Sequence, residues 1–115
     1  MKGSYPLENQ ENLQLIMGLI INGGNAKSDA MEAIHAAKVS DFELADQKLK
    51  DSDKGLVEAH RSQTSMLTAE ASGEKTELSL LLIHGQDHLM NAITFRDMAS
   101  EVVDVYKKMA GVAID

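Results

Sequence analysis

Two histidines and an aspartate stand within five consecutive residues, in the segment His84-Gly85-Gln86-Asp87-His88. In a helix, residues three and four apart are neighbours, so His84 would lie beside both Asp87 and His88. A neutral imidazole nitrogen can ligate a transition metal or accept a phosphoryl group. This segment is therefore the main candidate for chemistry in the chain.

The residues alone leave three interpretations of this segment open. In a structural interpretation, the two histidines are partly exposed and Asp87 pairs with a lysine. In a zinc site, His84 and His88 bind one metal with His60 or Asp87 as a further ligand, but the metalloprotease form is excluded because its glutamate position holds Gly85. In a phosphoryl carrier, His84 is exposed, Gly85 leaves room beside it, and His88 donates to the phosphate oxygens.

Composition argues against several other classes of protein. The chain has no cysteine, which excludes disulfides, thiolate catalysis, iron–sulfur clusters and Cys-ligated zinc. It has 11 Lys and Arg against 18 Asp and Glu, a net charge of −7, which argues against binding to nucleic acid or to an anionic membrane. No apolar run approaches the roughly 20 residues that span a bilayer, and the first residues do not resemble a secretory signal. We therefore expect a cytoplasmic protein with no membrane insertion.

The elements that position these residues are predicted to be helices. The chain is rich in helix-forming residues, contains 3% aromatic residues and has a single proline, Pro6. One all-α domain over 1–115 is expected, an antiparallel three-helix bundle with short connections. It comprises an arm at 1–8 and helices at about 9–37, 41–70 and 77–109. Ser40 and Glu43 fit a capping box for the second helix, and Thr76 is the expected cap of the third.

Sequence patterns also predict how the helices pack. Gly23-Gly24 either breaks the first helix or allows close packing against a neighbour, because each interior glycine costs about 1 kcal/mol relative to alanine. The stretch 48–54 is strongly charged and is expected to be solvated. The inner face of the second helix is predicted to consist of Phe42, Ala45, Leu49, Leu56, Ala59, Met66 and Leu67.

The third predicted helix is apolar on almost every side over residues 78–83. A three-helix bundle buries one stripe of each helix, so a helix that is apolar all round needs another neighbour. Asp87 continues an apolar stripe, where a carboxylate is costly unless it is paired or bound to a metal. The other members of this stripe are Leu80, Ile83, Met90 and Thr94. Self-association is therefore preferred over a wide core stripe with one or two exposed leucines.

At these residues the sequence resembles a known family, the enzyme IIA components of the lactose/cellobiose (N,N′-diacetylchitobiose) class of the phosphoenolpyruvate-dependent sugar phosphotransferase system. The resemblance covers about residues 13–108 in order and spacing, although Lys27 stands where the family often has arginine. Its most specific piece is the segment 84–90. The supporting segments are 18–20, 24–28, 36–38, 41–42, 58–60 and 63–64.

This resemblance implies an enzyme, a phosphotransferase component that carries a phosphoryl group. The group is expected to pass from HPr to His84, and then to a cysteine of the cognate IIB component. IIB would phosphorylate a β-linked disaccharide as the membrane component IIC carries it in. Gln86 and His88 are expected to support the phosphorylated His84, His60 to be structural or subsidiary, and His35 to lie on the surface.

The resemblance also implies a homotrimer of three-helix subunits. Asp87 falls on the family's metal-binding aspartate, whose three copies meet on the threefold axis around a divalent ion, usually Mg²⁺. The apolar run 78–83 would form the trimer seam, and the cation would offset three carboxylates that could not all stay ionised without it. Two alternatives are a metal-stabilised helical interaction module without phosphotransfer and a histidine phosphotransfer protein of another relay, whose typical lysine and glycine context is missing here.

Overall fold

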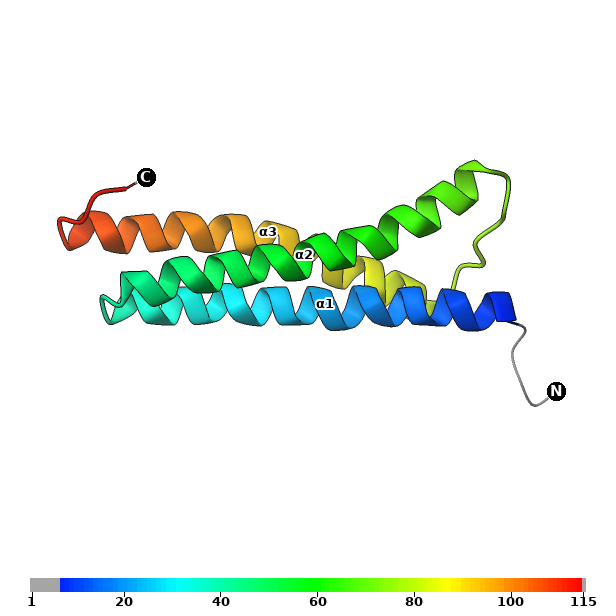
Figure 1. The fold of residues 1–115 in the computed structure, drawn as a ribbon, viewed down its shortest axis with the longest axis horizontal. Helices are drawn as coiled ribbons and strands as arrows, with labels where there is room; N and C mark the ends of the chain where they lie inside the picture. The colour runs from blue at the N-terminus through cyan, green and yellow to red at the C-terminus, as the bar shows by residue number, and fades with distance from the viewer. Residues whose placement is uncertain (1–6, 115) are drawn as a thin grey trace.

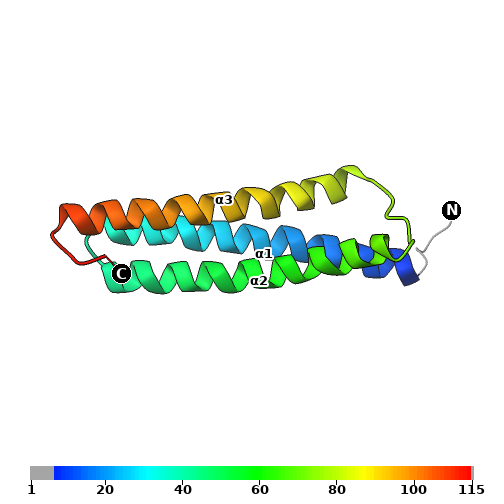
Figure 2. The ribbon, with the colours of Figure 1, turned by 90° about the horizontal axis from the view of Figure 1, so that it is seen from above.

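The structure, a computed structural model, describes residues 7–114 and consists of three long helices, which confirms the predicted all-α three-helix fold. The helices are α1 (Leu7–Lys38), α2 (Phe42–Ala71) and α3 (Leu80–Met109). They run antiparallel in order and form a rod of 61 × 28 × 18 Å. Helix α1 packs against both others, whereas α2 and α3 diverge at the end that carries the connection between them (Figure 1, Figure 2).

Two helix boundaries differ by more than one residue from the sequence prediction. Helix α1 begins at Leu7, so the last two residues of the predicted arm 1–8 are helical, and residues 1–6 lie outside the described residues. Helix α3 begins at Leu80 rather than near residue 77. Its N-cap is Ser79, whose Oγ accepts a hydrogen bond from the Leu82 backbone N–H at 3.1 Å. Because this hydroxyl satisfies one of the free N–H groups of the first turn, the helix begins after Ser79 rather than after Thr76.

The capping box predicted for Ser40 and Glu43 is wrong by one position. Asp41 caps α2, its carboxylate accepting from the Leu44 backbone N–H at 3.2 Å. Ser40 instead has a φ of 63°, in the left-handed region, and its backbone N–H donates to the Ala37 carbonyl that ends α1. A residue that ends one helix in this conformation cannot also cap the next, so the cap moves to Asp41.

Small side chains bring the helices close together. Helix α1 has a row of fully buried alanines at Ala26, Ala30 and Ala33. Helix α1 also continues unbroken through Gly23-Gly24. A Cβ at Gly23 would lie 3.4 Å from the backbone carbonyl of His88 in α3, which confirms the close-packing alternative.

The prediction for the inner face of α2 is confirmed in most positions. Ala45, Leu49, Ala59 and Met66 are buried, whereas Leu67 is 54% exposed and was wrongly assigned to the core. Leu67 belongs to the half of α2 that diverges from α3 (Figure 1), where its neighbour Met66 is buried at 6%. The core consists of two clusters, one around Leu49 and Val103 and one around Leu19 and Leu89.

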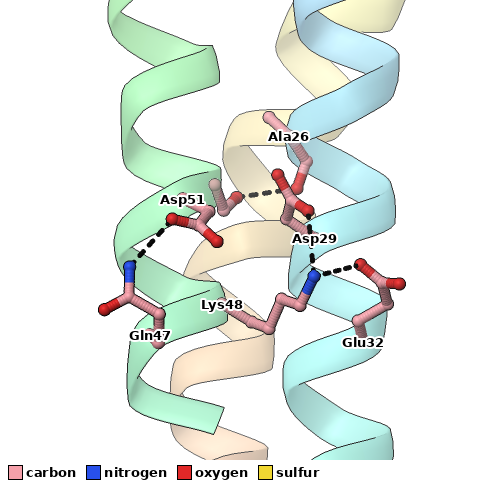
Figure 3. A network of polar contacts seen from close by, with 7 residues as sticks. Ala26, Asp29, Glu32, Gln47, Lys48 and Asp51 are labelled. Atoms are coloured by element: carbon pink, nitrogen blue, oxygen red, sulfur yellow. Dashed lines mark hydrogen bonds and ion pairs between the residues drawn. The ribbon is translucent and has the colours of Figure 1, made fainter. Parts of the chain in front are cut away.

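The charged stretch 48–54 is not fully solvated, contrary to the prediction. Ser52 is buried, and its hydroxyl donates to the Ala26 carbonyl of α1 at 2.7 Å. Lys48 reaches across to α1, with its Nζ 3.1 Å from Glu32 and 4.0 Å from Asp29 (Figure 3). Polar residues therefore join α1 to α2 at this level.

One stripe of α3 is left uncovered by the chain's own helices. Leu80 and Ile83 are 84% and 56% exposed, while Leu82 between them is buried at 5%. The exposed positions that follow on the same stripe are Asp87, Met90 and Thr94. No helix within the described residues 7–114 is long and apolar enough to cross a membrane.

Candidate functional site

The first turns of α3 place the side chains of His84 and His88 next to each other. His84 is exposed and His88 is half-buried. Their Nε2 atoms are 3.1 Å apart, and the ring centroids are 4.5 Å apart with the planes at 81° (an edge-to-face arrangement). The structure thus brings together the pair that the four-residue spacing predicted.

The 3.1 Å separation makes one imidazole the donor and the other the acceptor. When His88 donates its Nε2–H, His84 Nε2 is the acceptor and carries a lone pair, with its own proton on Nδ1. A lone pair on an exposed imidazole nitrogen is a nucleophile. The pair therefore presents one reactive nitrogen at the surface, with a hydrogen-bond donor beside it.

Glycine contacts with α1 determine where these histidines lie. Gly85 is buried, and a Cβ there would be 3.4 Å from the Ile16 carbonyl oxygen and from the Leu19 side chain. At the next turn, Gly23 of α1 approaches the backbone of His88 equally closely. Because Gly85 faces α1, its neighbour His84 is directed outward.

The Gln86 side chain lies on a different side of α3 from the side chains of His84 and His88. Its Oε1 accepts a 2.7 Å hydrogen bond from Nε2 of Gln63 in α2, in a half-buried position. The described contacts of Gln86 therefore tie α3 to α2. Gln63 stands 23 residues away in the sequence, so only the presence of Gln63-Thr64 among the family-like segments pointed to it.

Asp87 is exposed on the uncovered apolar stripe of α3. Its backbone carbonyl accepts from Asn91 Nδ2 at 3.0 Å, but across residues 7–114 its carboxylate takes part in no ion pair or hydrogen bond. The lysine partner of the structural interpretation is thus not found. A lone carboxylate on an apolar stripe suits contact with a cation from outside the subunit.

The other two histidines lie apart from the pair. His60 is exposed on α2, in a shallow depression formed with Val57, Arg61 and Thr64, and His35 is exposed on α1 as predicted. Within the described part of one chain, three or more His, Cys, Asp or Glu side chains are nowhere gathered as a metal site. The three-ligand zinc site with His60 or Asp87 is therefore not formed within one subunit.

A small apolar hollow of about 240 Å³ lies between α2 and α3, on the side of α3 that carries Gln86. Met66 and Leu67 of α2 and Leu82, Ile83 and Gln86 of α3 contribute to its walls. Gln86 therefore belongs to the side of α3 that faces α2, whereas the histidine pair lies on another side.

Comparison with known proteins gives consistent results. The family model for the lactose/cellobiose-specific IIA subunit of the phosphotransferase system matches residues 14–107. The lichenan-specific phosphotransferase enzyme IIA component of Bacillus subtilis (strain 168) is 52% identical over 101 residues, which cover 88% of this chain and 92% of that protein. The cellobiose-specific EIIA component of Lactococcus lactis subsp. lactis (strain IL1403) is 51% identical over 89 residues, 77% of each chain.

Solved structures agree with the sequence relatives. The cellobiose-specific enzyme IIA from Bacillus anthracis superposes with a TM-score of 0.86 at 47% identity, over 89% of this chain and 94% of that one. A solution structure of the IIA(chitobiose)–HPr complex from the Escherichia coli phosphotransferase system gives a TM-score of 0.75 at 36% identity, over 86% and 96%. With a family model spanning most of the helical bundle and relatives matched over nearly their whole length, this chain belongs to the lactose/cellobiose-specific IIA family of the phosphotransferase system and is a phosphotransferase component.

Proposed function

We propose that the chain accepts a phosphoryl group from HPr on Nε2 of His84 and passes it to a cysteine of its IIB partner, during uptake of a β-linked disaccharide through the membrane component IIC. The observation that carries this proposal is the exposed His84 ring with its Nε2 held 3.1 Å from Nε2 of His88. Both transfer partners are proteins, and a ring on an exposed helix face can meet each of them in turn.

In the first step, the lone pair on His84 Nε2 attacks phosphorus, and the bond between phosphorus and HPr breaks. The His88 Nε2–H, which donates to His84 in the free protein, then turns to a phosphoryl oxygen and stabilises its negative charge. The chain contributes positioning and charge stabilisation rather than covalent chemistry of its own. In the second step, a IIB thiolate attacks phosphorus and the nitrogen–phosphorus bond breaks, which returns the lone pair to His84.

HPr as the donor is supported by a structural relative. One solved neighbour is described as an IIA(chitobiose)–HPr complex and shares this fold over 86% of the chain. In the present chain the surface around His84 includes the exposed apolar side chain of Leu81, which lies outside the stripe proposed below for the trimer. An apolar patch beside the acceptor gives a docking protein a surface that the net charge of −7 does not oppose.

The homotrimer is proposed on the exposed stripe of α3. Leu80, Ile83, Asp87 and Met90 alternate at spacings of three and four, which is the pattern of a helix seam packed against other helices. The chain's own α1 and α2 leave these positions exposed. Three copies packed along this stripe would cover Leu80, Ile83 and Met90 and bring three Asp87 side chains together.

The donor set at Asp87 fits a hard divalent ion such as Mg²⁺. Its carboxylate oxygens are the ligands that magnesium prefers, and no positive side chain within residues 7–114 neutralises them. Three adjacent carboxylates without a cation would repel one another and would not all stay ionised. Asp87 from each subunit would hold the ion, which would offset this charge.

The proposed carrier site is tested by mapping the phosphate. The full chain is incubated with phosphoenolpyruvate, enzyme I and HPr, and acid-labile phosphate is located by mass spectrometry. His84→Ala should abolish labelling with helicity and assembly unchanged, because His84 is exposed and makes no core contact. The matched control, His60→Ala, should take up as much phosphate as the unsubstituted chain. Full labelling of the His84→Ala protein would place the acceptor elsewhere.

A further inference from the structure

The distance between the Nε2 atoms of His84 and His88 is close to the distance that separates two nitrogen ligands on one tetrahedral metal ion. Zinc binds imidazole nitrogens at about 2.0–2.1 Å, so two such nitrogens on one tetrahedral ion are roughly 3.3 Å apart. In this chain Nε2 of His84 and Nε2 of His88 are 3.1 Å apart. We propose that His84 and His88 form a bidentate binding site for a divalent transition-metal ion of the zinc class, with one ion per chain.

The ligand type determines which ions this site accepts. Imidazole nitrogen suits Zn²⁺, Cu²⁺ and Ni²⁺, whereas Mg²⁺ requires oxygen ligands and near-octahedral geometry. The histidine pair therefore differs in chemistry from Asp87, although Asp87 is adjacent in sequence. An excess of Mg²⁺ should occupy carboxylates and leave the two imidazoles available.

Binding requires a small rearrangement of the pair. In the free protein one Nε2 carries a proton, which must move to Nδ1 of the same ring so that both Nε2 lone pairs can point at the ion. The ring planes, now at 81°, must also turn so that these lone pairs converge. His84 is exposed, so its ring can rotate and water can fill the remaining coordination positions. Two neutral rings change tautomer without losing a proton from the pair.

A consequence follows for phosphate transfer, and it rests on the proposed function of His84. The lone pair on His84 Nε2 cannot bind a metal and attack phosphorus at the same time. A bound zinc ion and a phosphoryl group therefore exclude each other. The metal site itself depends only on the geometry of the two imidazoles.

The site is tested by isothermal titration of the full chain with ZnCl₂ in a large excess of MgCl₂. The expected result is one zinc ion per chain. His84→Ala and His88→Ala should each weaken binding by at least about tenfold, since loss of a ligand costs no less than loss of its supporting shell. His60→Ala, which removes an exposed histidine outside the pair, should leave the affinity unchanged.

Two outcomes would overturn the proposal. One is zinc affinity that survives His84→Ala, a substitution at an exposed position that leaves the core intact. The other is a stoichiometry of one ion per three chains that is lost in Asp87→Asn, which would assign the zinc to the carboxylates.

A separate measurement keeps this proposal distinct from the carrier function. Purified phospho-HPr is mixed with the zinc-loaded chain, and uptake of phosphate is followed. Loss of uptake supports competition at His84. Zinc held by the pair together with undiminished uptake would support the metal site and contradict His84 as the phosphoryl acceptor.

Discussion

At the scale of single residues, the nitrogen proposed as the phosphoryl acceptor is hydrogen-bonded by one side-chain neighbour. His84 alone would be an ordinary exposed histidine, with either ring nitrogen free to hold the proton. His88, one turn away, makes Nε2 of His84 the atom that is hydrogen-bonded. Asp87 between them is directed to the apolar stripe. Three polar residues within five positions therefore face different directions, because successive residues of a helix point to different sides.

A second feature at this scale is the set of acidic side chains around Lys48, among them Asp29 and Glu32. Burial raises the pKa of the Asp29 carboxyl above its usual value of 3.8, and the charges of Asp51 and Glu32 raise it further, while Lys48 opposes the shift. A carboxyl whose pKa is higher in the folded state than in the unfolded state binds its proton more tightly when folded. Ionised Asp29 therefore reduces stability at neutral pH, and this loss disappears as the pH falls through the raised pKa.

Asp29→Asn should consequently stabilise the fold slightly at pH 7. The gain should be no more than about 0.5 kcal/mol, because the residue is partly solvated and its 4.0 Å contact with Lys48 is weak. The difference from the parent should shrink as the pH is lowered towards 3.8. The difference in the free energy of unfolding is measured by urea unfolding of both proteins at a series of pH values. A variant that is less stable at pH 7, or a difference independent of pH, would contradict this assignment.

At the scale of elements, α3 is held by different contacts on its two inner sides. Towards α1, buried Gly85 and the facing Gly23 permit close backbone approach. Towards α2, polar pairs link the helices at successive levels, which are Asp46–Lys107, Asp53–Arg96 and Gln63–Gln86. Of the α3 residues in these pairs, Gln86 stands between the two histidines in the sequence. These contacts set the rotation of α3 and hence the direction of His84.

Gly23 and Gly24 provide a matched pair for testing this packing. Both are helical, but a Cβ at Gly23 meets the His88 backbone at 3.4 Å, whereas one at Gly24 meets nothing within 4 Å. Gly23→Val should lower the free energy of unfolding by about 1–3 kcal/mol through overpacking. Gly24→Val should be neutral or slightly stabilising, since valine is the better helix former.

Thermal unfolding followed by circular dichroism compares these two variants, and phosphate uptake from phospho-HPr is measured on each. Gly23→Val should lose uptake as well as stability, because the added methyl groups displace the turn of α3 that carries His88. Equal melting temperatures for the two variants would show that the α1–α3 contact tolerates the added volume.

At the scale of the whole molecule, α3 carries an uncovered apolar stripe, and the homotrimer is proposed along it. A lone subunit exposes Leu80 and Ile83 beside a carboxylate that has no partner within residues 7–114. Assembly along this stripe would remove the apolar surface from water. Membership of the IIA family also decides against the two alternative functions considered from the sequence, an interaction module without phosphotransfer and another histidine relay.

Asp87→Leu should preserve or strengthen the proposed trimer. The substitution replaces mutual repulsion of three carboxylates by apolar contact, and replacing buried charge by packed apolar side chains is often neutral or stabilising by about 1–4 kcal/mol. Light scattering across a dilution series measures the assembly. The control Ile83→Asp adds a charge to the same stripe and should dissociate the assembly. Monomers from Asp87→Leu would show instead that metal bridging is the main attraction between subunits.

The sequence by itself determined the helical fold and the family, and it pointed to the residues proposed for the site. Helix-forming composition and apolar spacing predicted three helices, and the histidine spacing predicted a pair on one face. Local signals were less reliable at the caps, where Ser79 and Asp41 replaced Thr76 and Ser40. Several residues at each helix end can cap it, and the path of the chain between helices selects one of them.

Only the tertiary structure decided which contacts these residues make. The buried Ser52, the exposed Leu67 and the bond from Gln63 to Gln86 depend on how far α2 lies from its neighbours at each level. The same holds for the 3.1 Å approach of the two imidazoles, which requires specific side-chain rotations. Periodicity in a sequence specifies which side of a helix is apolar, whereas the partner of each side chain is set by packing between segments that are distant in the chain.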